Sequence, residues 1–146
     1  MNDIETAKAR FKSGSYSCVL VKGDVVYTSE QDGIAPMLGF ISDGTNLTGF
    51  SVADKIVGKA AALLFVLAGV KEVFACVMSR RAVEVFAEHG VKYSFDTFAE
   101  NIINRAGTDL CPMEKAVSDI ENPQEAIDAI KNALTALRAG KTEDTK

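Results

Sequence analysis

The sequence predicts a mixed three-layer α/β sandwich, in which helices cover both faces of a sheet of about four strands. Three observations support this fold class. Short β-rich runs alternate with helix-length segments, no internal repeat is visible, and no Pro- or Gly-rich linker divides the chain. With 146 residues, 47% of them apolar, the chain has the size of one globular domain. We expect a single domain over residues 1–139 and a polar, disordered tail over residues 140–146.

The N-terminal third predicts a helix, a hairpin and a second helix. Residues 3–13 place Ile4, Ala7 and Phe11 on one helix face. Residues 17–22 and 25–28 are β-rich, and a tight turn at Gly23 joins them into a hairpin. Residues 33–41 carry apolar side chains at a helical spacing.

A long alanine-rich helix is expected over residues 51–69. Ser51 followed by Asp54 three positions later is a capping-box signal for a helix start. Gly69 is of the residue type that ends helices. This segment would be the central helix of the fold.

A strand–helix–strand unit follows the central helix. Residues 71–78 predict a buried strand, residues 80–89 a helix that ends at Gly90, and residues 91–95 a further strand. This alternation predicts parallel pairing of the two strands across the connecting helix. Further helices are expected over residues 98–105, from Pro112 onward, and over residues 123–137.

Composition and charge exclude several classes of function. The net charge is −4 and no Lys- or Arg-rich patch is present, so we expect neither a nucleic-acid nor a membrane partner. The N-terminus does not resemble a secretory signal, and the longest mostly apolar run, residues 60–70, is too short to cross a bilayer. Three scattered cysteines indicate reduced thiols. We therefore expect a cytoplasmic protein.

The first candidate site is the expected start of the central helix. Lys55 and Lys59 are four apart and would share one helix face beside Asp54. Two ammonium groups and free backbone N–H groups could bind a phosphate or carboxylate. Asp54 could accept a hydrogen bond from a ribose hydroxyl or act as a base. Gly58 would allow close approach of a ligand, or equally tight packing of the helix. Alternatively, Asp54 only closes the capping box and the lysines are solvated.

A second helix start is expected at Ser79. Ser79 is a good N-cap residue, and Arg80 could clamp a phosphate; the alternative is a cap without a ligand. Both helix starts would face one crevice at the carboxyl end of a strand. The sequence thus predicts an anion-attracting crevice between them.

The third candidate set lies near Cys111. A thiol at a helix start tends toward the reactive thiolate, although Glu114 opposes this, so Cys111 is either a nucleophile or a packing residue. Glu114 is a further catalytic candidate. Asn104 and Arg105 could read a base edge or a carboxylate, or could cap the helix before them.

Two longer stretches are unusual: residues 51–63 read SVADKIVGKAAAL and residues 104–116 read NRAGTDLCPMEKA. They resemble the two signature segments of an uncharacterised prokaryotic family, domain of unknown function 1893, over roughly residues 17–120. The order of elements is similar to that of the cytidine-deaminase-like fold. The resemblance implies a deaminase-like sandwich whose activity is not established.

Zinc deaminases carry a His or Cys, with Glu two residues later, at the start of the central helix, and Pro-Cys-x-x-Cys at the start of the next. This chain offers Asp54 and Lys55 at the first place and Ser79 and Arg80 at the second. Neither set can form a thiolate- or imidazole-bound zinc site, so no metal or cofactor is expected. A zinc deaminase is kept only as a third interpretation.

Together, these residues predict a protein that binds a small anionic or nucleoside-like metabolite in a metal-free crevice. Any reaction would be metal-free group transfer or hydrolysis. The competing interpretation is a non-catalytic interaction module that acts through a dimer or partner surface, such as the last helix or an exposed sheet edge. A homodimer is left open.

Overall fold

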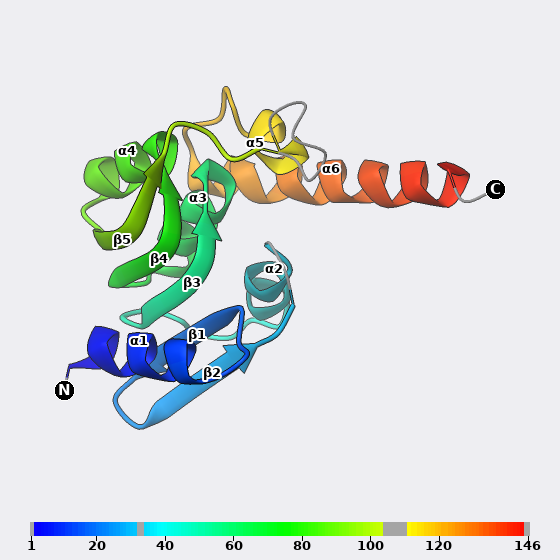
Figure 1. The fold of residues 1–146 in the computed structure, drawn as a ribbon. Helices are drawn as coiled ribbons and strands as arrows, with labels where there is room; N and C mark the ends of the chain where they lie inside the picture. Colours follow the sequence, from blue (N-terminus) through cyan, green and yellow to red (C-terminus); the bar gives the residue numbers. More distant parts are fainter. Residues whose placement is uncertain (1, 32–33, 104–110, 145–146) are drawn as a thin grey trace.

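The computed structural model describes residues 2–31, 34–103 and 111–144 of the chain. Figure 1 shows the order of the elements. In this order they are α1 (Asp3–Ser13), β1 (Cys18–Lys22), β2 (Val25–Ser29), α2 (Ala35–Ser42), β3 (Ser51–Val57), α3 (Lys59–Ala68), β4 (Glu72–Ser79), α4 (Arg80–His89), β5 (Lys92–Ala99), α5 (Pro112–Ala116) and α6 (Pro123–Asp144).

The described strands form one mixed sheet in the order β2-β1-β3-β4-β5. The β1–β2 and β1–β3 pairs are antiparallel, whereas β3, β4 and β5 are parallel to one another. Parallel neighbours need a crossover, which α3 and α4 provide. The predicted hairpin and the parallel strand–helix–strand unit are therefore confirmed, and the sheet has one strand more than the four expected.

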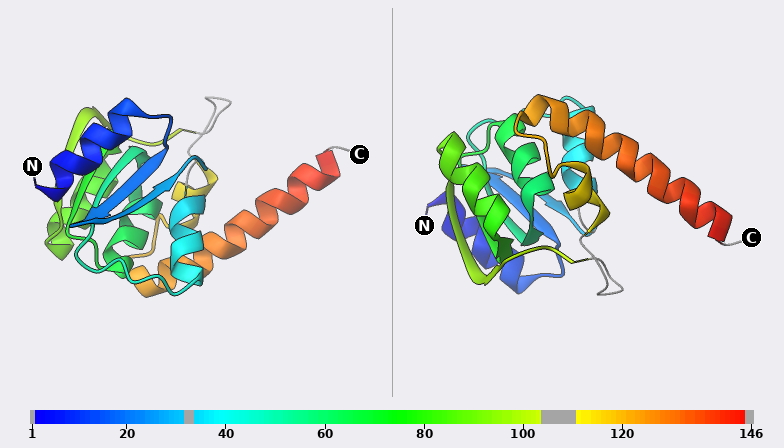
Figure 2. Two further views of the ribbon diagram at one scale, coloured as in Figure 1. Left: turned by 90° about the horizontal axis from the view of Figure 1, so that it is seen from below. Right: turned by 90° about the horizontal axis from the view of Figure 1, so that it is seen from above.

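Helices cover the two faces of this sheet, which makes three layers. The two views of Figure 2 show α1 on one face and α3 and α4 on the other. One hydrophobic cluster lies beneath α1 and includes Phe11, Val19 and Phe74. The larger cluster lies on the opposite face and extends from Leu20 and Val52 through Leu63 and Phe65 to Ile130 of α6. The predicted α/β sandwich is confirmed.

The segment 51–57 is a strand and not the first two turns of a helix, as the capping-box signal had suggested. It pairs with β1 on one side and with β4 on the other, so it is a central strand. Its β-branched residues Val52, Ile56 and Val57 suit that place. Gly58 is consequently the N-cap of α3 rather than a residue inside a helix. The predicted helix is confirmed over Lys59–Ala68 and at its end, Gly69 (φ +79°).

Two other predicted boundaries change. The helix expected over residues 98–105 is wrong in its described part. Phe98 and Ala99 belong to β5, where aromatic residues favour a strand, and residues 100–103 are not helical. Residues 104–110 lie outside the described residues. The last helix extends to Asp144, past its expected end at Leu137 and over part of the expected tail. The division into one domain and a tail stays a prediction. None of the helices in the described residues could cross a bilayer.

Candidate functional site

The starts of α3 and α4 lie next to each other at the carboxyl ends of the parallel strands β3 and β4. In the β3–β4 ladder, Val57 pairs with Met78, and the residues that follow, Gly58 and Ser79, are the N-caps of the two helices. The carboxyl ends of parallel strands are where α/β sheets commonly bind ligands. The two helix starts are therefore neighbours, as the sequence suggested, although the first is at Gly58 and not at Ser51.

Glu114 of α5 reaches the start of α3 and occupies its free backbone donors. Its carboxylate accepts hydrogen bonds from the backbone N–H of Lys59 at 2.7 Å and of Ala60 at 2.8 Å. Glu114 is 7% exposed. A Cβ on Gly58 would lie 2.3 Å from Oε1 of Glu114, so only glycine lets the carboxylate approach this closely. The chain thus supplies its own anion to this helix end.

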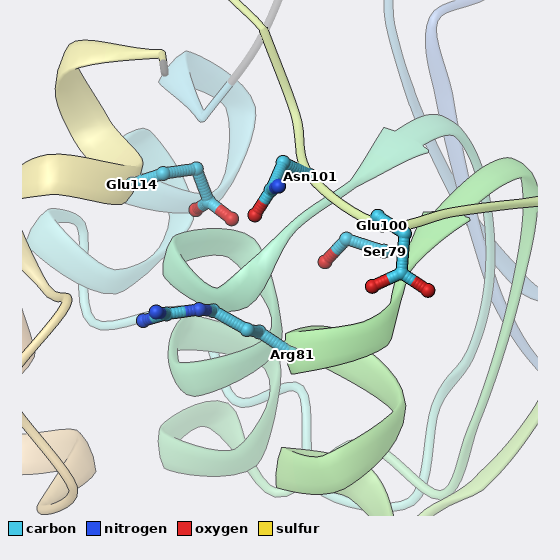
Figure 3. A pocket seen from close by; sticks show the side chains of 5 residues that line it. All are labelled: Ser79, Arg81, Glu100, Asn101 and Glu114. Carbon is cyan, nitrogen blue, oxygen red and sulfur yellow. The ribbon is translucent and has the colours of Figure 1, made fainter.

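Ser79 caps α4 from inside the crevice. Its Oγ accepts a hydrogen bond from the backbone N–H of Ala82 at 3.1 Å, and the residue is fully buried. Ser79, Glu114, Arg81, Glu100 and Asn101 surround a cavity of about 10 Å³. Figure 3 shows Glu114 and Asn101 directed toward each other above the start of α3. This cavity has room for one water molecule and no larger ligand.

A larger hollow of about 250 Å³ lies beside this cavity, between α4 and the segment that follows α5. The described lining is mostly charged and comprises Lys59, Arg80, Arg81, Glu84, Val85, Glu88, Ser118 and Glu121. Arg80 is neutralised at the rim, because its guanidinium contacts Glu84 at 2.8 Å and Glu100 at 3.0 Å.

The other two cations of the hollow converge on one oxygen atom. Nζ of Lys59 donates to the carbonyl oxygen of Ser118 at 3.1 Å, and Nη1 of Arg81 donates to the same oxygen at 3.4 Å. The Lys59 side chain is only 6% exposed. Its ion-pair partner is Glu121 at 3.4 Å, whose side chain is 72% exposed. The carboxylate that pairs with Lys59 is therefore solvated, and Glu84 and Glu88 line the same hollow.

Asp54 lies away from both helix starts. It sits in β3 opposite Cys18 of β1 and Ala75 of β4. Ala75 comes four residues before Ser79, the N-cap of α4. Burial raises the pKa of Asp54 to about 7, against a smaller lowering by the Lys55 backbone N–H, which donates to its carboxylate at 2.7 Å. Burial, and then the Asp54 charge, raise the pKa of the Cys18 thiol well above its usual value. Asp54 is a buried acid within the sheet rather than part of a helix-end anion site.

The predicted site residues thus separate into groups. One group meets at the carboxyl ends of β3 and β4 and consists of Gly58, Lys59, Ser79 and Glu114. Arg80 lies at its rim, and Lys55 is exposed on β3.

Cys111 is the N-cap of α5, half-buried against the core, and its side chain makes no capping hydrogen bond. Among the described residues, no hydrogen bond or ion pair joins Asp54 to Glu114 or Cys111. Asn104 and Arg105 lie outside the described residues.

Sequence reasoning missed Arg81, Glu100 and Asn101. Arg81 shares a face of α4 with Val85 and Glu88, a spacing of four and three that was visible in the sequence. Asn101 follows the carboxyl end of β5, which could have been recognised only if the end of that strand had been placed correctly.

The residues at the two helix starts do not fit the zinc that the deaminase resemblance implies. Among the described residues, the side chains around the crevice and the hollow are a lysine, two serines, two arginines, an asparagine, a valine and five glutamates, with no thiol or imidazole. Within the described ranges, no group of three His, Cys, Asp or Glu residues is placed to hold a metal. The bound carboxylate of Glu114 and the buried ammonium of Lys59 favour an anion-binding arrangement.

One family model and one solved structure match most of the chain. A family model described as "Domain of unknown function (DUF1893)" matches residues 6–134. The crystal structure of a DUF1893 family protein (TM1506) from Thermotoga maritima is similar at a TM-score of 0.82 and 28% identity, covering 90% of this chain and 89% of that one. The dCMP deaminase of cyanophage S-TIM5 has a TM-score of 0.39 and 13% identity, covering 64% of this chain and 93% of that one, a likeness too weak to inform on a site. No curated protein matches the chain.

Proposed function

The chain belongs to the DUF1893 family, whose description names no activity, and we propose from its own geometry that it binds a small anionic metabolite in the hollow beside α4. Lys59 and Arg81 would hold the phosphate or carboxylate group. Glu84 and Glu88, on the acidic side of the same hollow, could accept hydrogen bonds from hydroxyl groups such as those of a nucleoside.

The observation that carries this proposal is the convergence of Lys59 and Arg81 on the Ser118 carbonyl. Bringing two positive groups together costs free energy when one of them is buried. The carboxylates that line the hollow, Glu84, Glu88 and Glu121, are all exposed and compensate only part of that cost. An anion between the two groups would compensate the rest through charge-assisted hydrogen bonds. A volume of about 250 Å³ is near the lower limit for small-molecule sites.

Glu114 supports the same site indirectly. By binding the backbone N–H groups of Lys59 and Ala60, it fixes the first turn of α3 and with it the base of the Lys59 side chain. Because Glu114 accepts these two hydrogen bonds, the backbone N–H groups of Lys59 and Ala60 are not free to bind a ligand. The anion would therefore be bound by side chains, and not by the helix end that the sequence had suggested.

The proposal is for binding and does not include a reaction. Cys111, Glu114 and Asp54, the three catalytic candidates, are not joined by contacts in the described residues, and Glu114 is already used in holding α3. Group transfer or hydrolysis stays a prediction, as do the reactivity of Cys111 and the cytoplasmic location.

Isothermal titration calorimetry with inorganic phosphate and AMP tests the proposal. We expect saturable binding by the wild type and a loss of at least tenfold in affinity, about 1.4 kcal/mol, in each of Lys59→Met and Arg81→Gln. The matched control is Lys55→Met, which removes the same charge from an exposed position in β3 and should leave binding unchanged.

Absence of binding to either probe, or equal losses in the control, would overturn the proposal. Because Lys59 is buried, its variant could also lose stability; Arg81, which is only half-buried, tests the same site without that risk. Thermal unfolding of each variant separates the two causes.

A further inference from the structure

The β5 strand forms one edge of the sheet and exposes a row of aromatic side chains. Among the described residues, no strand lies beyond it in the sheet order, as Figure 1 shows. Tyr93 is 39% exposed, Phe95 37% and Phe98 45%. An open edge offers unpaired backbone donors and acceptors, and exposed apolar side chains beside it mark an interaction surface.

Tyr93 and Phe95 lie on the same face of the sheet, the one covered by α4, because side chains two apart in a strand share a face. Tyr93 stacks on Phe86 of α4 with ring centroids 6.3 Å apart, and Phe95 and Phe98 are 5.8 Å apart. The register of the β4–β5 ladder is the same before and after Asp96, with Ala75 opposite Phe95 and Val77 opposite Thr97.

The charges of the strand are also ordered. Lys92 and Asp96 are both exposed, stand two residues on either side of Ser94, and make no salt bridge within the described residues. Tyr93 and Phe95 are the immediate neighbours of Ser94. The sequence around Ser94 is therefore self-complementary if it is read against itself in the opposite direction.

We propose that β5 pairs with β5 of a second copy of the chain, antiparallel, about a two-fold axis at Ser94. In this register each Lys92 faces the partner's Asp96, and each Tyr93 faces the partner's Phe95, so opposite charges and aromatic rings form cross-strand pairs. Shifting the axis to Phe95 would instead place Lys92 opposite Phe98 and Ser94 opposite Asp96. The Ser94 register alone pairs both kinds of side chain, and a two-fold contact closes on itself as a dimer.

Size-exclusion chromatography with light scattering on the full chain tests the dimer. We expect the wild type to have twice the chain mass, and Asp96→Lys and Lys92→Asp each to weaken dimerisation at least tenfold by placing like charges opposite each other. The double variant Lys92→Asp with Asp96→Lys should restore the dimer. An equimolar mixture of the two single variants should form a heterodimer, because every charge then faces its opposite. Lys131→Asp, the same charge change on an exposed residue of α6, is the control and should leave the dimer intact.

A monomeric wild type at about 0.5 mM protein, where a complex of micromolar Kd would be populated, would overturn the proposal. So would a dimer that tolerates both single variants, or one that the double variant fails to restore, since each outcome excludes this register. The hollow at Lys59 and Arg81 lies outside β5. Failure of this proposal is therefore distinguishable from failure of the proposed ligand binding.

Discussion

Asp54 is the residue whose environment differs most from its expected one. A carboxyl group that the sequence suggested for a helix start lies in a central strand, 8% exposed and opposite the buried Cys18. The only hydrogen bond described for its carboxylate comes from the next backbone N–H. Burial disfavours the charged form more than this bond favours it, which is why the pKa rises to about 7.

This shift predicts how stability depends on pH. The ordinary pKa of an aspartate side chain is 3.8, so between about pH 4 and pH 7 the folded chain binds a proton that the unfolded chain has lost. The contribution of Asp54 is therefore fully present at low pH and decreases as the pH rises, by up to about 4 kcal/mol at pH 8. Asp54→Asn cannot ionise and should gain stability relative to the wild type as the pH is raised from 5 to 8, as urea unfolding at both values would show. Glu84→Gln, on the exposed face of α4, is the control and should follow the wild type; parallel curves for Asp54→Asn and the wild type would contradict the argument.

At the scale of elements, one carboxylate joins two helices that are far apart in the sequence. Glu114 binds α5 to the first turn of α3 across 54 and 55 residues, and Gly58 is the residue that admits it. Met113 and Val117 of the same segment are buried in the larger core, so the polar contact and the apolar contacts hold α5 in one place. The crevice depends on this junction, because Glu114 and Asn101 line its innermost cavity.

Gly58→Ala should break this junction. The φ of Gly58 is −104°, which alanine adopts freely, so the cost would come from the clash with Glu114 and the loss of two buried charge-assisted hydrogen bonds, about 3 kcal/mol. Urea unfolding measures this loss, and amide hydrogen exchange should be faster at Lys59 and Ala60. Gly39→Ala is the matched control: a Cβ there meets nothing within 4 Å inside α2, and the change should stabilise the chain by about 0.5–1 kcal/mol. Equal effects of the two substitutions would count against the role given to Gly58.

At the scale of the whole molecule, α6 completes the larger core before it extends away from the body, as Figures 1 and 2 show. Its first half contributes Ala126, Ile127 and Ile130 to the cluster beneath α3. The family model ends at residue 134, close to the last described contact of the helix with that cluster, at Leu134. The first half of α6 is thus part of the fold and not an appended tail.

Ile130→Ala tests this interpretation. Ile130 is fully buried, so removing its side chain should leave a cavity and destabilise the chain by about 2–4 kcal/mol. Thr135→Ala, on the exposed side of the same helix, should change stability by less than about 0.5 kcal/mol. A loss under about 1 kcal/mol for Ile130→Ala in urea unfolding would mean that α6 is only loosely attached.

Much of the fold could be predicted from local patterns. The first helix, the hairpin, the strand–helix–strand unit and the glycine ends at Gly69 and Gly90 all follow from periodicity and turn chemistry over short stretches. The errors are concentrated at Ser51–Val57 and after Phe95, where local signals compete. A serine three residues before an acid is a helix signal, but Ser51–Val57 has strand neighbours on both sides, and pairing with both outweighs the cap.

The candidate site was only partly accessible from the sequence, and the reason is distance along the chain. Local reasoning identified Lys59, Ser79 and Glu114 as chemically suited residues, but it placed Asp54 and Lys55 among them because it placed the helix start seven residues too early.

The sequence by itself determined which segments are apolar and where most helices end. It also determined that the zinc ligands of the deaminases are missing, because all these properties belong to single residues and short spacings. Only the tertiary structure decided that Glu114 fills the start of α3, that Lys59 and Arg81 meet at one carbonyl oxygen, and that Asp54 is buried. The first two of these facts depend on contacts between residues 37 to 59 positions apart, and the third depends on pairing with strands on both sides, none of which a local pattern specifies.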